Sequence, residues 1–171
     1  MTKIVQMGNK MLRKKAEEID LGDITSPKIQ KIIVTMNEAL ATQNDGVAIA
    51  APQIGSSLRI FTVSPIVFEE SGNHPLVYIN PVITQRSEKT KWLHEGCLSC
   101  RWKVGEVERS LSVTIEAYDE HGNLFTESAD GLLAHIFQHE TDHLDGVLFI
   151  DKARKLRDMT DEEINELLLN G

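Results

Sequence analysis

The stretch FQHETDHLDG, residues 137–146, decides which fold the rest of the chain must build. It places His139 and His143 four positions apart, with Glu140 directly after the first histidine. Residues four apart on an α-helix are separated by about 40° around the axis, so both imidazoles face the same way and can bind one metal ion. Glu140 borders that face and can reach a metal-bound water without being a ligand. Two imidazoles alone leave the ion under-ligated, so the stretch predicts a metal site whose third ligand lies elsewhere.

The segment from Asp130 to Gly146 has the features of the helix that this spacing requires. Asp130 is suited to the N-cap position and Gly146 to the end of the helix. Leu132 and Ile136 precede His139 on the same face, so we expect the histidines to point inward. A solvated helix with scattered histidines is the alternative. It is disfavoured because two histidines and a glutamate are costly to bury without a role.

Patterns elsewhere in the chain predict the fold class. Strand-like segments come before the metal-binding helix, with no regular alternation of strand and helix. We therefore expect an α+β fold, in which mixed or antiparallel β-sheets pack around a central metal-binding helix that carries His-Glu-x-x-His. The expected elements are a helix at 26–46 capped by Ser26, strands at 58–63, 74–84 and 111–128, the last with a turn at 120–123, and an acidic helix at 159–171 capped by Thr160.

Composition and charge limit the class of protein further. The chain has 171 residues, of which 41% are hydrophobic and 26% charged, and these values fit one globular domain spanning residues 1–171. A formal net charge of −8 argues against a nucleic-acid partner. No run approaches the roughly 18 apolar residues of a membrane span, and the N-terminus lacks the apolar region of a secretory signal. We expect a cytoplasmic protein of bacterial type, with an organellar matrix as the alternative, that binds neither nucleic acid nor a membrane.

The third ligand is best sought among the cysteines. Cys97 and Cys100 are the only two in the chain, and in a reducing compartment they are better explained as ligands or reactive thiols than as a disulfide. The glutamates of 159–171 have the pattern of a surface helix. Cys97 follows a glycine at the end of a polar stretch, and a thiolate is a strong ligand for a borderline divalent metal. Cys97 with His139 and His143 leaves a fourth position for water.

Three other interpretations of these residues remain open at this point. The pair Cys97 and Cys100 with both histidines would make a closed structural zinc module, although 38 residues separate Cys100 from His139, unlike a compact zinc finger. A redox dithiol is the second, but the strand-helix-strand context of thioredoxin-like proteins is missing. The third is a true metalloprotease, for which no convincing downstream ligand follows the second histidine.

Three motifs appear in a characteristic order: GVAIAAPQIG at 46–55, EGCLS at 95–99 and QHETDH at 138–143. Together they closely resemble the signature motifs of the peptide deformylases, and the resemblance extends over most of residues 1–150. This family removes the formyl group from the N-terminal formylmethionine of newly made polypeptides. The resemblance therefore implies a metal-dependent hydrolase that releases formate from N-formyl-Met nascent peptides, with a transient ribosome contact as a further expectation.

The resemblance also assigns roles to individual residues. It implies one divalent metal ion, natively Fe2+, with Zn2+, Ni2+ or Co2+ able to take its place. The expected metal ligands are Cys97, His139 and His143. The expected catalytic groups are the Glu140 carboxylate, the Gln53 side-chain amide and the Leu98 backbone N–H, and the expected main-chain contacts to the substrate are Val47, Ala48 and Ile49. The methionine side chain would lie near Ile136 and His135, and an Asp142–Arg109 pair would bridge the metal helix to the sheet.

One position and one short segment depart from the family pattern. Ala48 stands where the family usually has glycine, and the added methyl group narrows the local backbone freedom. After EGCLS the family commonly continues with an aliphatic residue and proline, whereas this chain has Cys100, Arg101 and Trp102. These departures keep a catalytically silent relative of the deformylases as an alternative, and they predict an altered loop beside the substrate.

Overall fold

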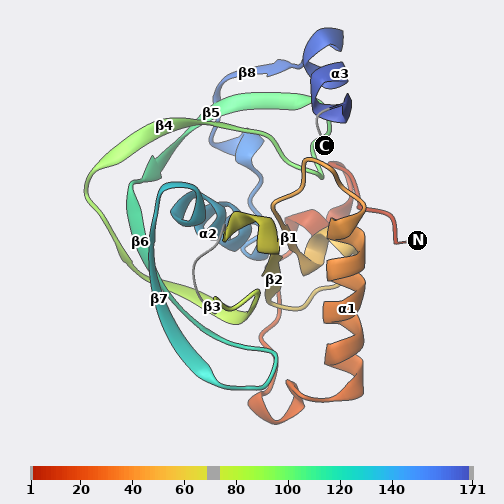
Figure 1. The fold of residues 1–171 in the computed structure, drawn as a ribbon, viewed down its shortest axis with the longest axis vertical. Coiled ribbons are helices and arrows are strands. Elements are labelled where there is room, and N and C mark those ends of the chain that lie inside the picture. Colours follow the sequence, from red (N-terminus) through yellow and green to blue (C-terminus); the bar gives the residue numbers. More distant parts are fainter. Residues whose placement is uncertain (1, 69–73, 170–171) are drawn as a thin grey trace.

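The computed structural model describes residues 2–68 and 74–169 of the chain. Figure 1 shows helix α2 (Gly131–Leu144) in the middle of the molecule, with curved strands around one side and helix α1 (Pro27–Ala41) on the other. The remaining helix of the described ranges, α3 (Asp161–Leu169), lies beside β8. The strands are β1 (Ala48–Ala50), β2 (Ile60–Val63), β3 (Val77–Arg86), β4 (Thr90–Glu95), β5 (Lys103–Ser110), β6 (Ser112–Tyr118), β7 (Leu124–Asp130) and β8 (Arg154–Asp158). Short 3-10 helices cover Lys10–Arg13, Leu21–Asp23, Ala51–Ile54, Pro65–Val67 and Phe149–Asp151.

The strands form two antiparallel sheets. The larger sheet has the order β1-β2-β3-β6-β7, and the smaller sheet has the order β4-β5-β8. Antiparallel sheets around a central helix confirm the predicted α+β class. In the described part of the chain, β1 is an edge strand that pairs with β2 alone, through partners such as Ala48 and Val63. An edge strand leaves one row of backbone N–H and C=O groups for another strand to join.

The smaller sheet is absent from the sequence-based prediction. Its two outer strands are mostly solvent-exposed: all five residues of β8 are exposed, and β4 buries only Glu95 fully. Strands of this kind carry little of the apolar alternation by which strands are recognised. The sheet is held instead by its backbone ladder and by surface pairs such as Arg154 with Glu106, at 2.8 Å.

Helix α1 forms largely as its sequence predicts. The hydroxyl of Ser26 accepts a hydrogen bond from the Ile29 N–H at 3.4 Å, and Pro27 occupies the first helical position. Its apolar face is buried against the core. The helix ends at Ala41, earlier than the predicted boundary at 46, because the chain turns as the Gly46 N–H donates to the Gln43 carbonyl.

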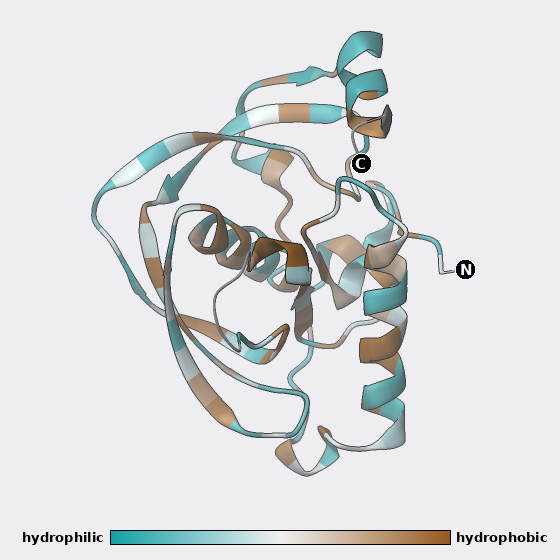
Figure 2. Ribbon diagram, viewed as in Figure 1, coloured by the Kyte–Doolittle hydropathy of each residue, from teal (hydrophilic) through white to brown (hydrophobic). Residues whose placement is uncertain are grey.

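Helix α2 packs its apolar face against the larger sheet. The fully buried Phe137 ring lies 5.0 Å from that of Tyr78 and 6.0 Å from that of Phe61, centroid to centroid. Phe61 and Tyr78 stack on each other at 4.5 Å. Figure 2 shows the same contrast: hydrophobic residues gather on the central elements, whereas β8 and α3 are largely hydrophilic. In the ranges that the structure describes, no helix has both the length and the hydropathy to span a bilayer.

The two ends of α2 differ in how well they follow the prediction. Asp130 occupies the predicted N-cap position, but its side chain makes no capping hydrogen bond. Gly146 follows the helix with φ of +75°, a left-handed conformation that favours glycine. A β-carbon at Gly146 would lie 2.7 Å from the backbone oxygen of Arg13, so the close passage of the chain also requires glycine there.

The segment of residues 4–16, here called the N-terminal arm, contacts the first two motif segments and the end of helix α2. The Val5 N–H donates to the Gln53 carbonyl at 2.8 Å, and the Met7 N–H donates to the Ser99 carbonyl at 2.7 Å. The Ala16 N–H donates to the carbonyl of Leu144, the last residue of α2, at 2.7 Å. The arm therefore joins the first two motifs to the metal-binding helix.

Candidate active site

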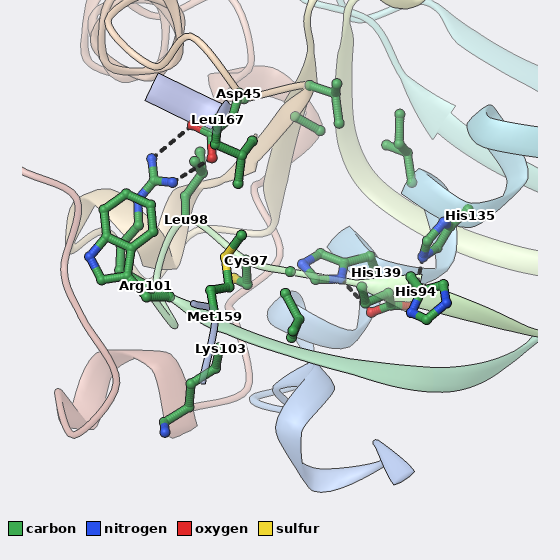
Figure 3. Close-up of a pocket in the computed structure, with 18 of the residues that line it drawn as sticks. Asp45, His94, Cys97, Leu98, Arg101, Lys103, His135, His139, Met159 and Leu167 are labelled. Atoms are coloured by element: carbon green, nitrogen blue, oxygen red, sulfur yellow. Dashed lines mark hydrogen bonds and ion pairs between the residues drawn. The ribbon is translucent and has the colours of Figure 1, made fainter. Parts of the chain in front are cut away.

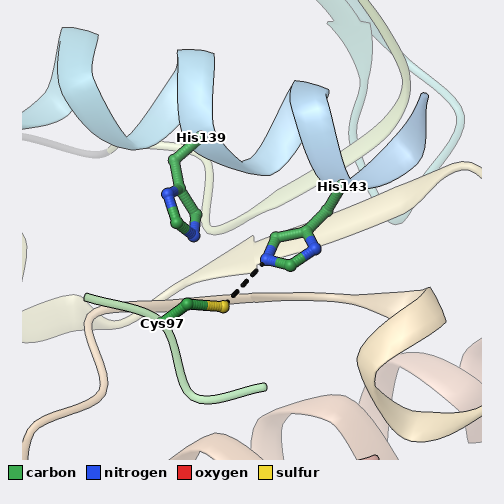
Figure 4. A group of neighbouring side chains, drawn as sticks. All are labelled: Cys97, His139 and His143. Carbon is green, nitrogen blue, oxygen red and sulfur yellow. Dashed lines mark hydrogen bonds between the residues drawn. The ribbon is translucent and has the colours of Figure 1, made fainter. Parts of the chain in front are cut away.

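Three side chains from two parts of the fold converge on one point (Figure 4). The metal-binding atoms of Cys97, His139 and His143 all lie within 4.8 Å of one another. The Cys97 sulfur is 3.1 Å from Nε2 of His143. Helix α2 supplies the two histidines one turn apart, and the turn after β4 supplies the cysteine. The structure thus brings together the three residues that the sequence nominates as ligands.

Cys100 has a different environment from Cys97. Within the described residues it does not join the group of converging donors. It is fully buried in an apolar cluster with Leu12, Val107, Leu148 and Phe149. Its N–H donates to the Cys97 carbonyl at 3.0 Å, which closes a tight turn. A closed site of two cysteines and two histidines needs four mutually close donors, whereas this geometry supplies three.

Glu95, the last residue of β4, orients the imidazoles of α2. Its carboxylate accepts hydrogen bonds from Nδ1 of His139 at 2.9 Å and from Nε2 of His135 at 2.7 Å. Arg109 donates to both Glu95 oxygens, at 2.6 and 3.0 Å. Burial raises the pKa of Glu95, but these hydrogen bonds outweigh it and hold the pKa below its ordinary value. Because Nδ1 of His139 is occupied, Nε2 is the nitrogen that faces a metal ion.

The two metal-site histidines are electrostatically different. Burial works against protonation of His139, but the hydrogen bond to Glu95 and the charge of Glu140 outweigh it and raise its pKa. Burial dominates at His143 and holds its pKa well below the ordinary value. His143 is therefore neutral, the form in which an imidazole offers a lone pair to a metal.

Arg109 links the smaller sheet to the metal-binding helix. Besides Glu95, it contacts Asp142 of α2, with a nitrogen–oxygen distance of 2.6 Å. Lys152 also donates to both oxygens of Asp142, at 2.7 and 2.8 Å. The expected Asp142–Arg109 bridge is present. The guanidinium is buried, so removal of one partner would leave a charge without compensation.

Glu140 is a buried carboxylate beside the converging donors. It is 4% exposed, and its Oε2 has no hydrogen-bond partner among the described residues. Burial raises its pKa to about 7. A carboxyl group poised near neutrality, with an oxygen directed to no protein donor, has the properties of a general acid and base.

Gln53 is fixed next to the Cys97 turn. Its Oε1 accepts the Ala50 N–H at 2.8 Å, which sets the amide orientation. Its Nε2 then donates to the Ser99 hydroxyl at 3.2 Å and lies 3.7 Å from the Cys97 sulfur. The side chain is buried, so its amide is held inside the protein beside the Cys97 turn.

A pocket of about 530 Å³ opens in front of these groups (Figure 3). The nominated residues that line it are Val47, Ala48, Gln53, Cys97, Leu98, His139 and Glu140. His143 is buried and is not one of the lining residues, and the Ile49 side chain is fully buried in the core, which leaves only the Ile49 backbone for substrate contact. Ile136 and His135 also line the pocket, as expected. The Arg101 and Trp102 pair of the altered loop forms part of its rim.

The sequence interpretation missed the most connected residue of the site. Glu95 precedes the glycine and cysteine of the second motif, and nothing in its local sequence marks it as buried. Its three partners lie between 14 and 44 residues away in the chain. The buried Arg109 offers the one available signal, because a charge at an otherwise apolar strand position requires a carboxylate partner.

The donor set fits a divalent metal ion. One thiolate and two imidazoles are the ligands of an open, tetrahedral type of site, in which a fourth position stays available for substrate or water. The Nε2 atom of His139 is free toward the site because Nδ1 is bonded to Glu95. An α+β fold with an open metal-binding group, a buried carboxylate and a pocket in front of them defines a metallohydrolase.

Comparison with known proteins places the chain within that class. The polypeptide deformylase family model matches residues 1–159, and the chain belongs to this family. The activity of the chain is accordingly the hydrolytic removal of the formyl group from newly made polypeptides. This membership favours the deformylase interpretation over a structural zinc module.

Individual relatives agree with the family match. A peptide deformylase of Desulfitobacterium hafniense is 41% identical over 152 residues, which are 89% of this chain and 94% of that protein. The chloroplastic/mitochondrial peptide deformylase 1A of Arabidopsis thaliana is also 41% identical, over 87% of this chain but only 60% of the longer plant protein.

Solved structures show the same fold. The peptide deformylase of Thermotoga maritima superposes with a TM-score of 0.79 and 36% identity, covering 90% of this chain and 98% of that one. The enzyme from Synechococcus elongatus, in complex with actinonin, has a TM-score of 0.78 and 32% identity, covering 98% of this chain and 84% of the other.

Proposed function

We propose that Cys97, His139 and His143 hold one divalent metal ion in the formyl-hydrolysing site, and that Fe2+ is the native ion. The observation that carries the proposal is the convergence of their donor atoms within 4.8 Å beside the pocket. Mixed sulfur and nitrogen donors suit the divalent ions from iron to zinc, so Zn2+, Ni2+ and Co2+ fit the same ligands. When bound, such an ion supplies Lewis acidity, which polarises the formyl oxygen and lowers the pKa of water.

Glu140 moves the proton in this scheme. It accepts a proton from the water that attacks the formyl carbon, and it delivers that proton to the amine nitrogen as the carbon–nitrogen bond breaks. The products are formate and a free N-terminal amine. Its burial and its pKa near 7 support both halves of this role, because the group can exist in either form at neutral pH.

Gln53 and Leu98 stabilise the charge that develops on the formyl oxygen. The Nε2 amide of Gln53 and the backbone N–H of Leu98 come from the first and second motifs, and both residues line the pocket. In hydrolases, each fixed donor directed at a developing oxyanion stabilises the transition state by about 3 kcal/mol. The hydrogen bond from the Ala50 N–H holds the Gln53 amide in place before substrate arrives.

The substrate is bound as an additional strand. The backbone of Val47, Ala48 and Ile49 belongs to or directly precedes the edge strand β1, which supports a main-chain ladder to an extended N-formyl-Met peptide. The methionine side chain then lies near Ile136 and His135. Because the substrate is a nascent chain, we infer a transient contact with the ribosome and a cytoplasmic location.

The decisive experiment is formate release by protein loaded with iron or nickel without oxygen. Formyl-Met-Ala is the substrate, and acetyl-Met-Ala is its matched control. Formate should appear from the first peptide, whereas the acetyl peptide should be a poor substrate, because its extra methyl group crowds the site and lowers the reactivity of the carbonyl. Equal rates on the two peptides, or cleavage of internal peptide bonds, would reassign the chain to a broader amidase or protease class.

A further inference from the structure

The C-terminal segment closes one side of the substrate pocket. Met159, Glu163 and Leu167 all line it. Glu163 and Leu167 are four residues apart and share one face of α3, and Met159, two positions before that helix, joins them to form a stripe at the pocket. Figure 3 shows Met159 and Leu167 on the same side of the pocket as Arg101 and Asp45. The sequence pattern predicts a surface helix here, and none of the deformylase motifs assigns this stripe a role.

Several contacts fix the stripe relative to the site. The Met159 N–H donates to the Trp102 carbonyl at 2.7 Å, which ties α3 to the loop after Cys100. Arg157 of β8 donates to both oxygens of Glu163, at 2.7 and 2.6 Å. The same carboxylate accepts the Thr160 N–H at 2.8 Å, while the Thr160 hydroxyl accepts the Glu163 N–H at 3.3 Å. The start of α3 is therefore anchored to the smaller sheet, and the stripe keeps its orientation toward the pocket.

The same side of the pocket carries a second ion pair. Arg101 makes two contacts with the Asp45 carboxylate, at 2.5 and 3.0 Å, and donates to Gln43 at 2.8 Å. The charges of Arg101 and Glu163 are thus neutralised by partners within the protein. The apolar side chains of Met159 and Leu167 are among those that remain for contact with a ligand. This side of the pocket therefore has a partly apolar lining.

We propose that the Met159 and Leu167 side chains bind the third and later residues of the formylated peptide and favour apolar side chains there. The inference rests on the proposed function, in which the methionine side chain lies near Ile136 and His135. Those residues lie on the other side of the pocket from α3, as Figure 3 shows for His135. A peptide whose methionine side chain lies near His135 therefore extends its later residues across the pocket toward Met159 and Leu167.

The test is a comparison of substrate length. Formyl-Met-Ala and formyl-Met-Ala-Leu-Leu are hydrolysed by the wild-type metalloenzyme, by Met159→Ala/Leu167→Ala, and by Leu167→Ser as a milder second variant. Leu168→Ala is the matched control, because Leu168 belongs to the same helix but is 57% exposed and does not line the pocket. The KM of the double variant for the longer peptide should rise by about tenfold, the low end of what a lost apolar contact costs in a binding pocket.

The kinetic constants for the short peptide distinguish direct contact of Met159 and Leu167 with the longer peptide from a role of α3 in supporting the fold. Its kcat and KM should be unchanged in every variant, and the wild type should bind the longer peptide more tightly than the short one. An unchanged KM for the longer peptide in both stripe variants overturns the inference, and so does an equal loss on the two peptides, which would mean that α3 only supports the fold. If the wild-type protein hydrolyses neither peptide, the proposed function itself is wrong.

Discussion

The Glu95 carboxylate lies 2.9 Å from Nδ1 of His139, and this contact sets the face that the imidazole presents to the ligand group. The same carboxylate is buried against Arg109 and His135, so the strand β4 and the helix α2 are joined through one residue. Orienting partners of metal-bound histidines are worth about 10- to 100-fold in metal affinity.

Replacing Glu95 by Gln tests this relationship. The amide removes the negative charge and one acceptor, so metal affinity should fall by about 10- to 100-fold, as measured by competition with a chelator. The variant should also unfold at lower temperature, because Arg109 would keep a buried charge with a weakened partner. Glu108→Gln is the control, since Glu108 is exposed on the neighbouring strand and should leave both properties unchanged. If Glu95→Gln binds the metal as tightly as the wild type, Glu95 does not orient His139 for metal binding.

Replacing Glu140 by Gln should separate catalysis from metal binding. The side chain keeps its size, and Glu140 is not part of the converging donor group, so the metal content and the melting temperature should stay close to those of the wild type. Turnover of formyl-Met-Ala should fall by at least about 100-fold, the usual loss when a general acid and base is removed. Metal analysis accompanies the kinetics, and a variant that loses its ion together with its activity would make Glu140 a ligand.

The two cysteines should respond differently to substitution. Cys97→Ser should lose most of its metal affinity, because a hydroxyl group is a far weaker ligand than a thiolate. Cys100→Ser should keep one ion per chain and most of the activity, with some loss of stability because a polar group enters an apolar cluster. The measurement is metal stoichiometry of the two purified variants side by side. Matching losses would favour a closed structural zinc site.

Tyr78 should make the protein sensitive to alkali. Burial, reinforced by the 2.7 Å hydrogen bond to Glu127, raises the pKa of the Tyr78 phenol. The unfolded chain ionises this phenol at about pH 10, whereas the folded chain keeps it protonated. Its contribution to stability is therefore complete below about pH 10 and is lost as pH rises further toward the raised folded pKa.

The variant Tyr78→Phe isolates that contribution. At pH 7 it should be less stable than the wild type by about 1 kcal/mol, the usual value of one hydrogen bond. Above about pH 10 the stability difference between variant and wild type should shrink. Only the wild type has a phenol that ionises in the unfolded chain while it stays protonated in the folded chain, and this lowers its stability. Urea unfolding at pH 7, 9 and 11 measures this difference. A stability difference that is the same at all three pH values would contradict the raised pKa of Tyr78.

Local signals explain which elements can be predicted from sequence. Ser26 and Thr160 cap their helices because both the cap and its N–H partner lie within three residues. The histidine pair of α2 is equally local. Glu95 is different, since its role depends on residues from β5 and α2 that only the folded chain brings near. Cap and ligand spacing are thus visible in the sequence, whereas buried ion pairs between distant segments are not.

The C-terminal helix gives a second example. Its acidic sequence predicts a surface helix, which is correct for Glu162 and Glu166, both of which are exposed. Glu163 is only partly exposed, because Arg157 draws it toward the pocket. A single stripe of a mainly polar helix produces too weak a periodic signal to be separated from the solvated residues around it.

The contacts of the N-terminal arm have a consequence for the order of events during translation. The ribosome synthesises residues 4–16 before any of the three segments that the arm joins. The bond from Ala16 to Leu144 cannot form until the end of α2 has emerged, and Leu12, which is 1% exposed in the folded chain, stays in water until then. The N-terminal arm therefore cannot complete its docking until α2 has been made, and until then the nascent protein exposes the apolar side chain of Leu12.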